Sequence, residues 1–421
     1  MSEQLTENEI SKDWRNPFRV ISFILVIIAL MDSMIMWGVP TLGKLITYGL
    51  KLLILIAIPF LIHCSKTANF FWALAVLPFT WILFDEKSVG SLVQYFYSAV
   101  LPIFAFFLLP PVYRKWCVLL FLKIVSTLFI IGFIYYILLN IGIVPPHFTY
   151  VRDHDGRTYY NFFFMYYTQG LDPLVLIRFP SAWDEPGVIG TMCAMVLFYF
   201  RSELSRKQFY TFFIAGCLSL SMFFIIMIVP ILYFSKFREF SVAKKNWRSL
   251  LFLILIVVGY FGASFLANKT KEHPMLKFSV YHRFKWEGQF IVGVYSNRDV
   301  MDGFEESYQK FVSKGGMQFW ITGKGKNSTV DEFGSTGLSH RILIYEKGLL
   351  ILLYLAIFYI YMHVNWRKDY IFNLVSIIFL LLLFTQRPLL YGLYFVMIIY
   401  TGLRLSSTKD EEDSAYNSLS K

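Results

Sequence analysis

Long apolar runs recur along most of the chain, and short polar segments, mostly basic, separate them. A helix needs roughly 20 apolar residues to cross a bilayer. Several runs approach or reach that length, so we predict helices that span a membrane. The runs predict helices at residues 18–39, 44–62, 69–84, 91–109, 116–139, 187–200, 208–219, 221–235, 249–267, 342–363, 370–386 and 388–403.

The apolar run at residues 209–234 is long for one helix and short for two, given a rise of about 1.5 Å per residue. Its flanks, residues 201–207 and 236–248, are both strongly basic. Basic flanks favour the cytoplasmic side of a membrane. We therefore predict two short helices that turn near residues 219–221.

The same rule orients the whole chain, because Lys and Arg gather on one set of connections. The predicted outer connections are residues 143–186, residues 268–339 and short loops with few cations. The cytoplasmic side would carry both termini and the cations Arg15, Arg19, Lys66, Arg114, Lys115, Arg201, Arg206, Lys207, the 236–248 cluster, Arg367, Lys368 and Arg404.

These patterns predict an all-α polytopic integral membrane protein with about 12 transmembrane helices. It would have one large and one medium outer loop. Residues 1–405 would form a single transmembrane domain that includes the outer loops 143–186 and 268–339. Residues 406–421 are polar and predict a disordered cytoplasmic tail. The first apolar run follows a polar, partly acidic N-terminus and is interpreted as a retained span.

Composition supports this class. Hydrophobic residues make up 57% of the chain and charged residues 16%, and the mean hydropathy is +0.55. Soluble domains carry about 25% charged residues. The net charge of +11 follows from the orientation and from anionic headgroups, not from nucleic-acid binding, because no basic domain stands apart from the membrane. The four cysteines are not grouped, so neither a disulfide set nor a metal site is expected.

The two long outer loops carry the candidate chemistry. The first ends in Arg178-Phe179-Pro180-Ser181-Ala182-Trp183-Asp184-Glu185-Pro186-Gly187, just before a predicted helix. The second carries Arg283, Arg298, Gly323-Lys324-Gly325 and then His340-Arg341. Arginine forks suit phosphate oxygens, so the set favours an anionic substrate. The alternative is a capped helix with arginines that contact headgroups.

Residues 302–312 predict an amphipathic helix lying on the membrane surface. Three other patterns are weaker. The glycines around Lys324 lack the spacing of a phosphate-binding Walker loop. Asp153-His154-Asp155 resembles a metal-binding pair but is a common accident in polar loops, and no metal is expected. Asp32 lies within the first span and is either functional or a water-accessible side chain.

The arrangement resembles the O-antigen polymerase (Wzy-type) and O-antigen ligase superfamily of bacterial membrane glycosyltransferases. The resemblance covers roughly residues 15–405, mostly as topology. Its specific parts are residues 178–187, Arg283, Arg298, residues 323–325 and residues 340–348. It implies transfer of a glycan from undecaprenyl diphosphate to another lipid-linked repeat unit, at the periplasmic face of the bacterial inner membrane. Both termini would lie in the cytoplasm.

The resemblance also implies roles for single residues. Arg178, Arg283, Arg298 and Arg341 would bind the diphosphate or sugars and replace a metal ion. Glu185 or His340 would act as the base that deprotonates the acceptor hydroxyl. Many ligases have His followed by Asn where this chain has His340-Arg341, so the identity of the base stays open. Implied partners are lipid-linked glycans and membrane lipids, with a chain-length regulator protein as a further candidate and no nucleic acid.

Three alternatives remain at this stage. A ligase would share the topology and much of the loop pattern. A flippase or exporter of lipid-linked oligosaccharides would share the number of spans, but transporters usually show internal repeats and charges near the midplane. A non-catalytic scaffold predicts that the loop arginines tolerate substitution.

Overall fold

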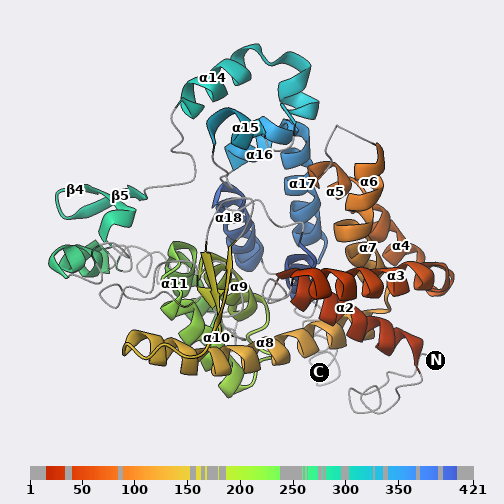
Figure 1. The fold of residues 1–421 in the computed structure, drawn as a ribbon, viewed down its shortest axis with the longest axis horizontal. Coiled ribbons are helices and arrows are strands. Elements are labelled where there is room, and N and C mark those ends of the chain that lie inside the picture. Colours follow the sequence, from red (N-terminus) through yellow and green to blue (C-terminus); the bar gives the residue numbers. More distant parts are fainter. Residues whose placement is uncertain are drawn as a thin grey trace, which may run out of the picture. The chain divides into compact units, whose positions relative to one another are not determined.

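In the computed structural model the chain forms two compact units. Figure 1 shows the helices and strands in the order of the sequence. Unit 1 comprises Met1–Ile124 and Arg298–Lys421, and unit 2 is Val125–Asn297. Helices make up 81% of the residues that the structure describes. The structure describes residues 16–33, 40–83, 89–151, 158–162, 166–167, 179, 186–237, 258, 261–262, 264–273, 277, 281–294, 303–325, 328–334, 340–366, 370–386 and 392–404.

The N-terminal part of unit 1 packs its helices around α7, in which every side chain is buried. Helix α4 contacts α7, and α2 and α3 contact both each other and α7. The elements in chain order are α2 (Pro17–Ser33), α3 (Pro40–Cys64), α4 (Thr67–Leu74), α5 (Phe79–Leu83), α6 (Val89–Tyr95), the π-helical η2 (Phe96–Val100), α7 (Leu101–Leu108) and α8 (Pro111–Asn140), which continues into unit 2.

The C-terminal part of unit 1 begins with short elements and continues into apolar helices. Helices α14 and α15 contact α16, which contacts α17, and α17 packs on α18. A further helix covers Leu393–Arg404. The labelled elements are α14 (Phe304–Lys314), the π-helical η6 (Gln318–Thr322), α15 (Ser328–Phe333), α16 (His340–Lys347), α17 (Leu349–Trp366) and α18 (Tyr370–Gln386).

Unit 2 is built on three helices, α9 (Pro186–Tyr199), α10 (Arg206–Leu218) and α11 (Met222–Phe237). Helix α9 packs against both others. The turn between α10 and α11 lies at residues 219–221, so the predicted helical hairpin is confirmed. A Cβ atom at Gly190 would lie 2.1 Å from the Cβ of Ser221, so α9 approaches this turn as closely as a glycine permits.

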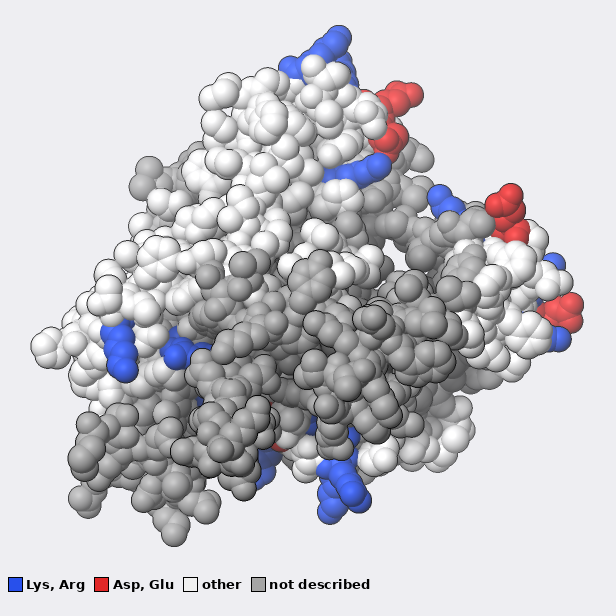
Figure 2. Space-filling view, turned by 180° about the vertical axis from the view of Figure 1, so that it is seen from behind, with Lys and Arg blue, Asp and Glu red and all other residues white. Residues whose placement is uncertain are grey.

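Three helical segments are long and apolar enough to cross a membrane: Leu45–Cys64, Gly90–Leu108 and Pro111–Asn140. Shorter apolar helices occur at Pro17–Met31, Gly187–Tyr199, Phe223–Leu232, Leu349–His363, Leu374–Leu383 and Leu393–Arg404. Large apolar side chains such as Leu45 and Ile56 are exposed along α3, as expected of a lipid-facing surface. On the face seen in Figure 2, most of the described residues are uncharged and drawn in white. The helices therefore fit a membrane protein, while about twelve spans and their orientation stay predictions.

Two predicted helices are each broken by a single residue. The segment predicted at residues 69–84 forms α4 and α5, joined by a turn at residues 75–78, because Pro78 lacks an N–H and in a continuous helix its ring would clash with the carbonyl of Leu74. The segment predicted at residues 342–363 begins at His340 and is divided at Gly348 into α16 and α17. Gly348 has a positive φ of 83°, a conformation that glycine adopts without strain.

The prediction of an all-α chain missed two small sheets in the long loops. Strands β1 (Phe148–Val151), β2 (Thr158–Asn161) and β3 (Tyr166–Tyr167) form an antiparallel sheet in that order. Strands β4 (Phe284–Glu287) and β5 (Phe290–Val294) form a hairpin after the 3₁₀ turns η4 (Thr270–Glu272) and η5 (Tyr281–Arg283). Aromatic and β-branched residues dominate β1–β3, and they favour strands.

Candidate functional site

Two glycines join the loop of unit 1 to the start of its apolar helix α17. A Cβ at Gly323 would lie 2.2 Å from the carbonyl carbon of Glu346, and a Cβ at Gly348 would lie 2.7 Å from that of Ile321. Both glycines have positive φ, at 68° and 83°. We call this contact the glycine junction. It brings together residues 323–325 and 340–348, two segments that the sequence had singled out.

Backbone hydrogen bonds fix the junction. The Lys324 N–H donates to the Tyr345 carbonyl at 2.7 Å, and the Gly325 N–H donates to the Glu346 carbonyl at 3.1 Å. The Thr329 hydroxyl donates to the Glu346 carboxylate at 2.5 Å, so α15 is attached to α16 as well. The turn that holds Lys324 is therefore fixed against α16 by main-chain contacts.

A polar cluster lies on this junction, and we call it the Lys324 cluster. The Lys324 Nζ lies 3.0 Å from both carboxylate oxygens of Glu332 and 2.6 Å from the Tyr345 hydroxyl. The Tyr345 hydroxyl donates to Glu332 Oε2 at 2.6 Å. The ammonium also lies 4.6 Å from the centre of the Tyr345 ring, within range of a cation–π contact.

The cluster shifts the pKa of two of its members. Partial burial alone would lower the pKa of Lys324, but the hydrogen bonds with Tyr345 and Glu332 outweigh it and raise the pKa. The pKa of Tyr345 is raised because of burial and because its hydroxyl donates to the Glu332 carboxylate. Lys324 is therefore an ammonium and Tyr345 a neutral hydroxyl at neutral pH, and both are hydrogen-bond donors.

The amphipathic helix predicted at residues 302–312 is present as α14, Phe304–Lys314. Its apolar side packs on α16, whereas the prediction placed it on the membrane surface. The protein thus supplies an apolar partner for this face, and its charged side stays exposed near the top of Figure 2. The shared core consists of Phe304, Phe311, Ile342 and Tyr345, with Tyr308, Phe319 and Phe333 against it.

Of the predicted site residues, His340 and Arg341 lie in the described part of the chain. His340 is the first residue of α16 and is half-buried. Arg341 Nη1 forms an ion pair with Glu305 Oε2 at 2.6 Å, and its guanidinium lies 5.6 Å from the Tyr308 ring centre. The pKa of Glu305 is lowered, first by a hydrogen bond from Gln309 and then by Arg341. Arg341 thus attaches α14 to α16.

The remaining predicted residues fall elsewhere. Arg178, Glu185 and Arg298 lie outside the described residues. Arg283 ends the turn η5, and its side chain is likewise not described. Their convergence with His340 and Arg341 therefore stays a prediction.

Both described ends of the 178–187 segment are anchored in unit 2. The Phe179 N–H donates to the Leu218 carbonyl at 3.0 Å. Its buried ring lies 4.9 Å from the ring of Phe133 and 5.7 Å from that of Tyr136, both on α8. At the other end, Pro186 begins α9, one residue before the start of the predicted helix, and proline suits the first turn of a helix.

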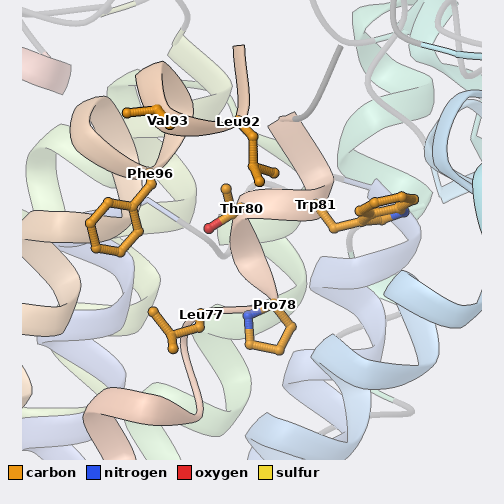
Figure 3. Close-up of a pocket in the computed structure, with 7 residues that line it drawn as sticks. All are labelled: Leu77, Pro78, Thr80, Trp81, Leu92, Val93 and Phe96. Atoms are coloured by element: carbon orange, nitrogen blue, oxygen red, sulfur yellow. The ribbon is translucent and has the colours of Figure 1, made fainter. Parts of the chain in front are cut away.

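An apolar pocket of about 400 Å³ lies in unit 1, between the α4–α5 turn and α6 (Figure 3). Thr80 is the one polar residue of its described lining, which otherwise comprises Leu77, Pro78, Trp81, Leu92, Val93 and Phe96. The Trp81 indole N–H donates to the Ile321 carbonyl at 3.2 Å. Ile321 is the residue that packs on Gly348, so a residue of the pocket wall is hydrogen-bonded to a residue of the glycine junction.

Metal ligands are not grouped in the part of the chain that the structure describes, where no set of three His, Cys, Asp or Glu side chains comes together. Asp153-His154-Asp155 lies outside that part. Asp32 belongs to α2, but its side chain is not described. Sequence reasoning also missed Glu332 and Tyr345 as partners of Lys324, and the paired glycines were the one signal that could have indicated them.

Comparison with known proteins finds no matching family model, no similar curated protein and no similar solved structure. The interpretation of the site therefore depends on its own residues and on the resemblance of its short segments.

Proposed function

We propose that this chain is a membrane glycosyltransferase that polymerises undecaprenyl-diphosphate-linked oligosaccharide repeat units at the outer face of the bacterial inner membrane. The observation that carries the proposal is the glycine junction. It joins residues 323–325 to residues 340–348, the two segments of the resemblance that are described in full, and places them where an apolar helix begins. Cationic side chains, aromatic rings and an apolar pocket all lie in this part of unit 1.

In the proposed reaction, an acceptor sugar hydroxyl attacks the anomeric carbon of the donor glycan. The bond from that carbon to the diphosphate oxygen breaks, and the diphosphate leaves with the electron pair. His340 or Glu185 takes the proton of the hydroxyl. Arg178, Arg283, Arg298 and Arg341 stabilise the charge that develops on the leaving diphosphate. No metal ion takes part in this scheme.

The apolar pocket supports this substrate class. Its volume of about 400 Å³ falls within the range of about 300–1,000 Å³ common for ligand pockets. It is lined by aliphatic and aromatic side chains beside Gly90–Leu108, one of the candidate spans. A stretch of the polyprenyl chain fits such a lining, while its diphosphate would reach the cations beyond Trp81 and Ile321.

One observation favours the alternative of a transporter for lipid-linked oligosaccharides. Lys51 is 3% exposed and lies within the candidate span Leu45–Cys64. Ionisable groups inside spans often mark transport pathways. The ligase alternative shares every feature that supports the polymerase.

A genetic experiment separates these functions. A deletion strain is complemented with wild type, Arg178→Ala, Arg283→Ala, His340→Ala or the control Lys310→Ala, an exposed cation on α14. Surface glycans are run on a gel, and membrane levels of each variant are checked. For a polymerase, the deletion leaves core bearing a single repeat unit, and the two arginine variants fail to restore the ladder while Lys310→Ala restores it.

Other outcomes would contradict the proposal. Loss of all capped core, with lipid-linked polymer accumulating, identifies a ligase. Repeat units trapped on the cytoplasmic leaflet identify a transporter. Full ladders from every variant would remove the site assignment.

A further inference from the structure

Two hydrogen-bond donors from different segments converge on one carboxylate in the Lys324 cluster. Lys324 Nζ lies 3.0 Å from each oxygen of Glu332, and the Tyr345 hydroxyl lies 2.6 Å from Oε2. The ammonium reaches both carboxylate oxygens and the hydroxyl reaches Oε2, so the two donors meet at one oxygen and form a receptor for an oxyanion. Lysine commonly binds phosphate as a point charge, and a tyrosine hydroxyl adds direction.

The donor half of this receptor is held in place by the fold. Tyr345 belongs to the buried aromatic core, with its ring 5.1 Å from that of Phe311 and 5.5 Å from that of Phe304. The Lys324 main chain is bonded to the Tyr345 carbonyl, and glycines with positive φ flank it on both sides. These donors need little rearrangement to bind a different oxyanion. Binding therefore loses little conformational entropy.

The acceptor half is held much less firmly. Glu332 lies on the six-residue helix α15, and its side chain is 38% exposed. The described contacts of its carboxylate are those with Lys324 and Tyr345. A half-exposed ion pair contributes little to stability, because water competes for both partners. An anion with more charge than a carboxylate can therefore compete for the same donors.

We propose that Lys324 and Tyr345 form a binding site for a phosphate-type oxyanion, and that Glu332 occupies this site as a ligand supplied by the chain itself. Binding of a phosphate or diphosphate then requires the Glu332 carboxylate to turn out into water. The inference concerns the loop to which the proposed function assigns diphosphate binding, and it rests on that function for its biological ligand. The test below measures anion binding without turnover, so either proposal can fail while the other holds.

The second ion pair of the loop provides a matched control. Arg341 and Glu305 are 2.6 Å apart and lie on α16 and α14. Among their described contacts, no second donor from the buried core reaches the Glu305 carboxylate, which is bonded to Gln309 and Arg341 on the surface. Neutralising Glu305 should therefore release a cation without opening a two-donor site.

The test measures binding of inorganic diphosphate to the full chain in nanodiscs of zwitterionic lipid, by calorimetry or ³¹P NMR. We expect Glu332→Gln to tighten binding by about tenfold, because a charge-assisted hydrogen bond no longer has to be broken. The double variant Glu332→Gln, Lys324→Met should lose this gain in affinity, and the double variant Glu332→Gln, Tyr345→Phe should keep only part of it. Glu305→Gln should raise the affinity by less than Glu332→Gln does, because it frees one cation, Arg341, and opens no two-donor site.

Unchanged affinity in a Glu332→Gln variant with a wild-type thermal midpoint would overturn the proposal, as would equal gains from Glu305→Gln. If Glu332→Gln does not fold, Tyr345→Phe in the wild-type background decides, since the proposal requires weaker binding. The diphosphate titration is then repeated in nanodiscs that contain anionic phospholipid, to show whether the natural anion is a lipid phosphate or a soluble one. If the phospholipid weakens diphosphate binding in wild type but not in Lys324→Met, the site takes a lipid phosphate. If it does not weaken binding, the site takes a soluble anion.

Discussion

Two cations of unit 1, Arg114 and Lys324, differ in their burial and in the groups that bind them. Arg114, at the start of α8, is 1% exposed and is bound by neutral groups. Its guanidinium donates to the Tyr400 hydroxyl at 2.6 Å and to Asn69 Oδ1 at 2.9 Å, and it lies 4.9 Å from the Tyr400 ring centre. Lys324, by contrast, is 33% exposed and is bound by a carboxylate.

The comparison indicates which cations can meet a ligand. The partners of Arg114 come from α4 and from the Leu393–Arg404 helix, so this residue joins helices that are far apart in the chain. A buried charge with such partners cannot exchange them without leaving polar groups unsatisfied. The partner of Lys324 is half exposed to water and can be displaced. We therefore assign Arg114 to stability and Lys324 to binding.

The largest expected effect tests the structural half of this comparison. Arg114→Ala should lower the free energy of unfolding by about 3–5 kcal/mol, because it leaves a cavity and two polar groups without a donor. Arg114→Lys keeps the charge but loses the planar fork, so its loss should be intermediate. Thermal midpoints of the purified variants in detergent measure both. An unchanged midpoint for Arg114→Ala would break the comparison.

A second test concerns the glycine junction. Gly348→Ala should cost about 2–4 kcal/mol, because a positive φ is combined with a close approach to the Ile321 main chain. Gly325→Ala is the matched control, since φ is +98° there but no atom lies within 4 Å of the added Cβ. It should cost about 1–2 kcal/mol for the backbone conformation alone. Equal losses in thermal stability would show that the close contact contributes nothing.

A third test uses pH. The pKa values of Lys324 and Tyr345 are both raised in the folded protein, so the folded state binds more protons than the unfolded state in the alkaline range. The stabilisation is complete below the ordinary pKa values and is lost as the pH rises above about 10. Thermal midpoints of wild type should fall there more steeply than those of a Lys324→Met, Tyr345→Phe double variant. Parallel profiles would contradict the role of the cluster.

The smallest effect is expected for the surface ion pair. Glu305→Gln should leave the thermal midpoint almost unchanged at neutral pH, since Glu305 is exposed and solvent screens its attraction to Arg341. Because the pKa of Glu305 is lowered in the folded state, its ionisation stabilises the fold when the pH is above the ordinary pKa of a glutamate. This contribution is lost as the pH falls through the folded-state pKa. The small difference between wild type and Glu305→Gln should therefore vanish in acid. A large destabilisation at neutral pH would mean that this pair resembles Arg114.

The helices could be predicted from the sequence where length and apolarity decide. Eighteen consecutive residues of α8 carry few charges, and the basic flanks of residues 209–234 indicated the turn at residues 219–221. The break at Gly348 could not be seen, because it depends on the approach of Ile321 from another segment. Arg114 was predicted to lie on a cytoplasmic connection, which stays a prediction. Its burial against Asn69 and Tyr400 could not be predicted, because both partners are far from it in the sequence.

The candidate site was predictable only in part. Its segments at residues 323–325 and 340–348 were identified by their short motifs. Their contact follows from glycine geometry in three dimensions, which no periodicity encodes. Lys324 and Tyr345 are 21 residues apart, and Glu332 lies 8 residues from Lys324, so no helical or strand spacing pairs them. Partner choice of this kind depends on tertiary packing of the aromatic core.

The most direct test of the account is polymerisation by the purified protein in nanodiscs that contain undecaprenyl-diphosphate-linked repeat units. We predict lipid-linked products longer than one repeat unit, with release of undecaprenyl diphosphate, in wild type and in Lys310→Ala, and neither product in Arg178→Ala. Repeat units that stay unchanged in length, or that only move between the two leaflets, would contradict the assignment of a polymerising glycosyltransferase.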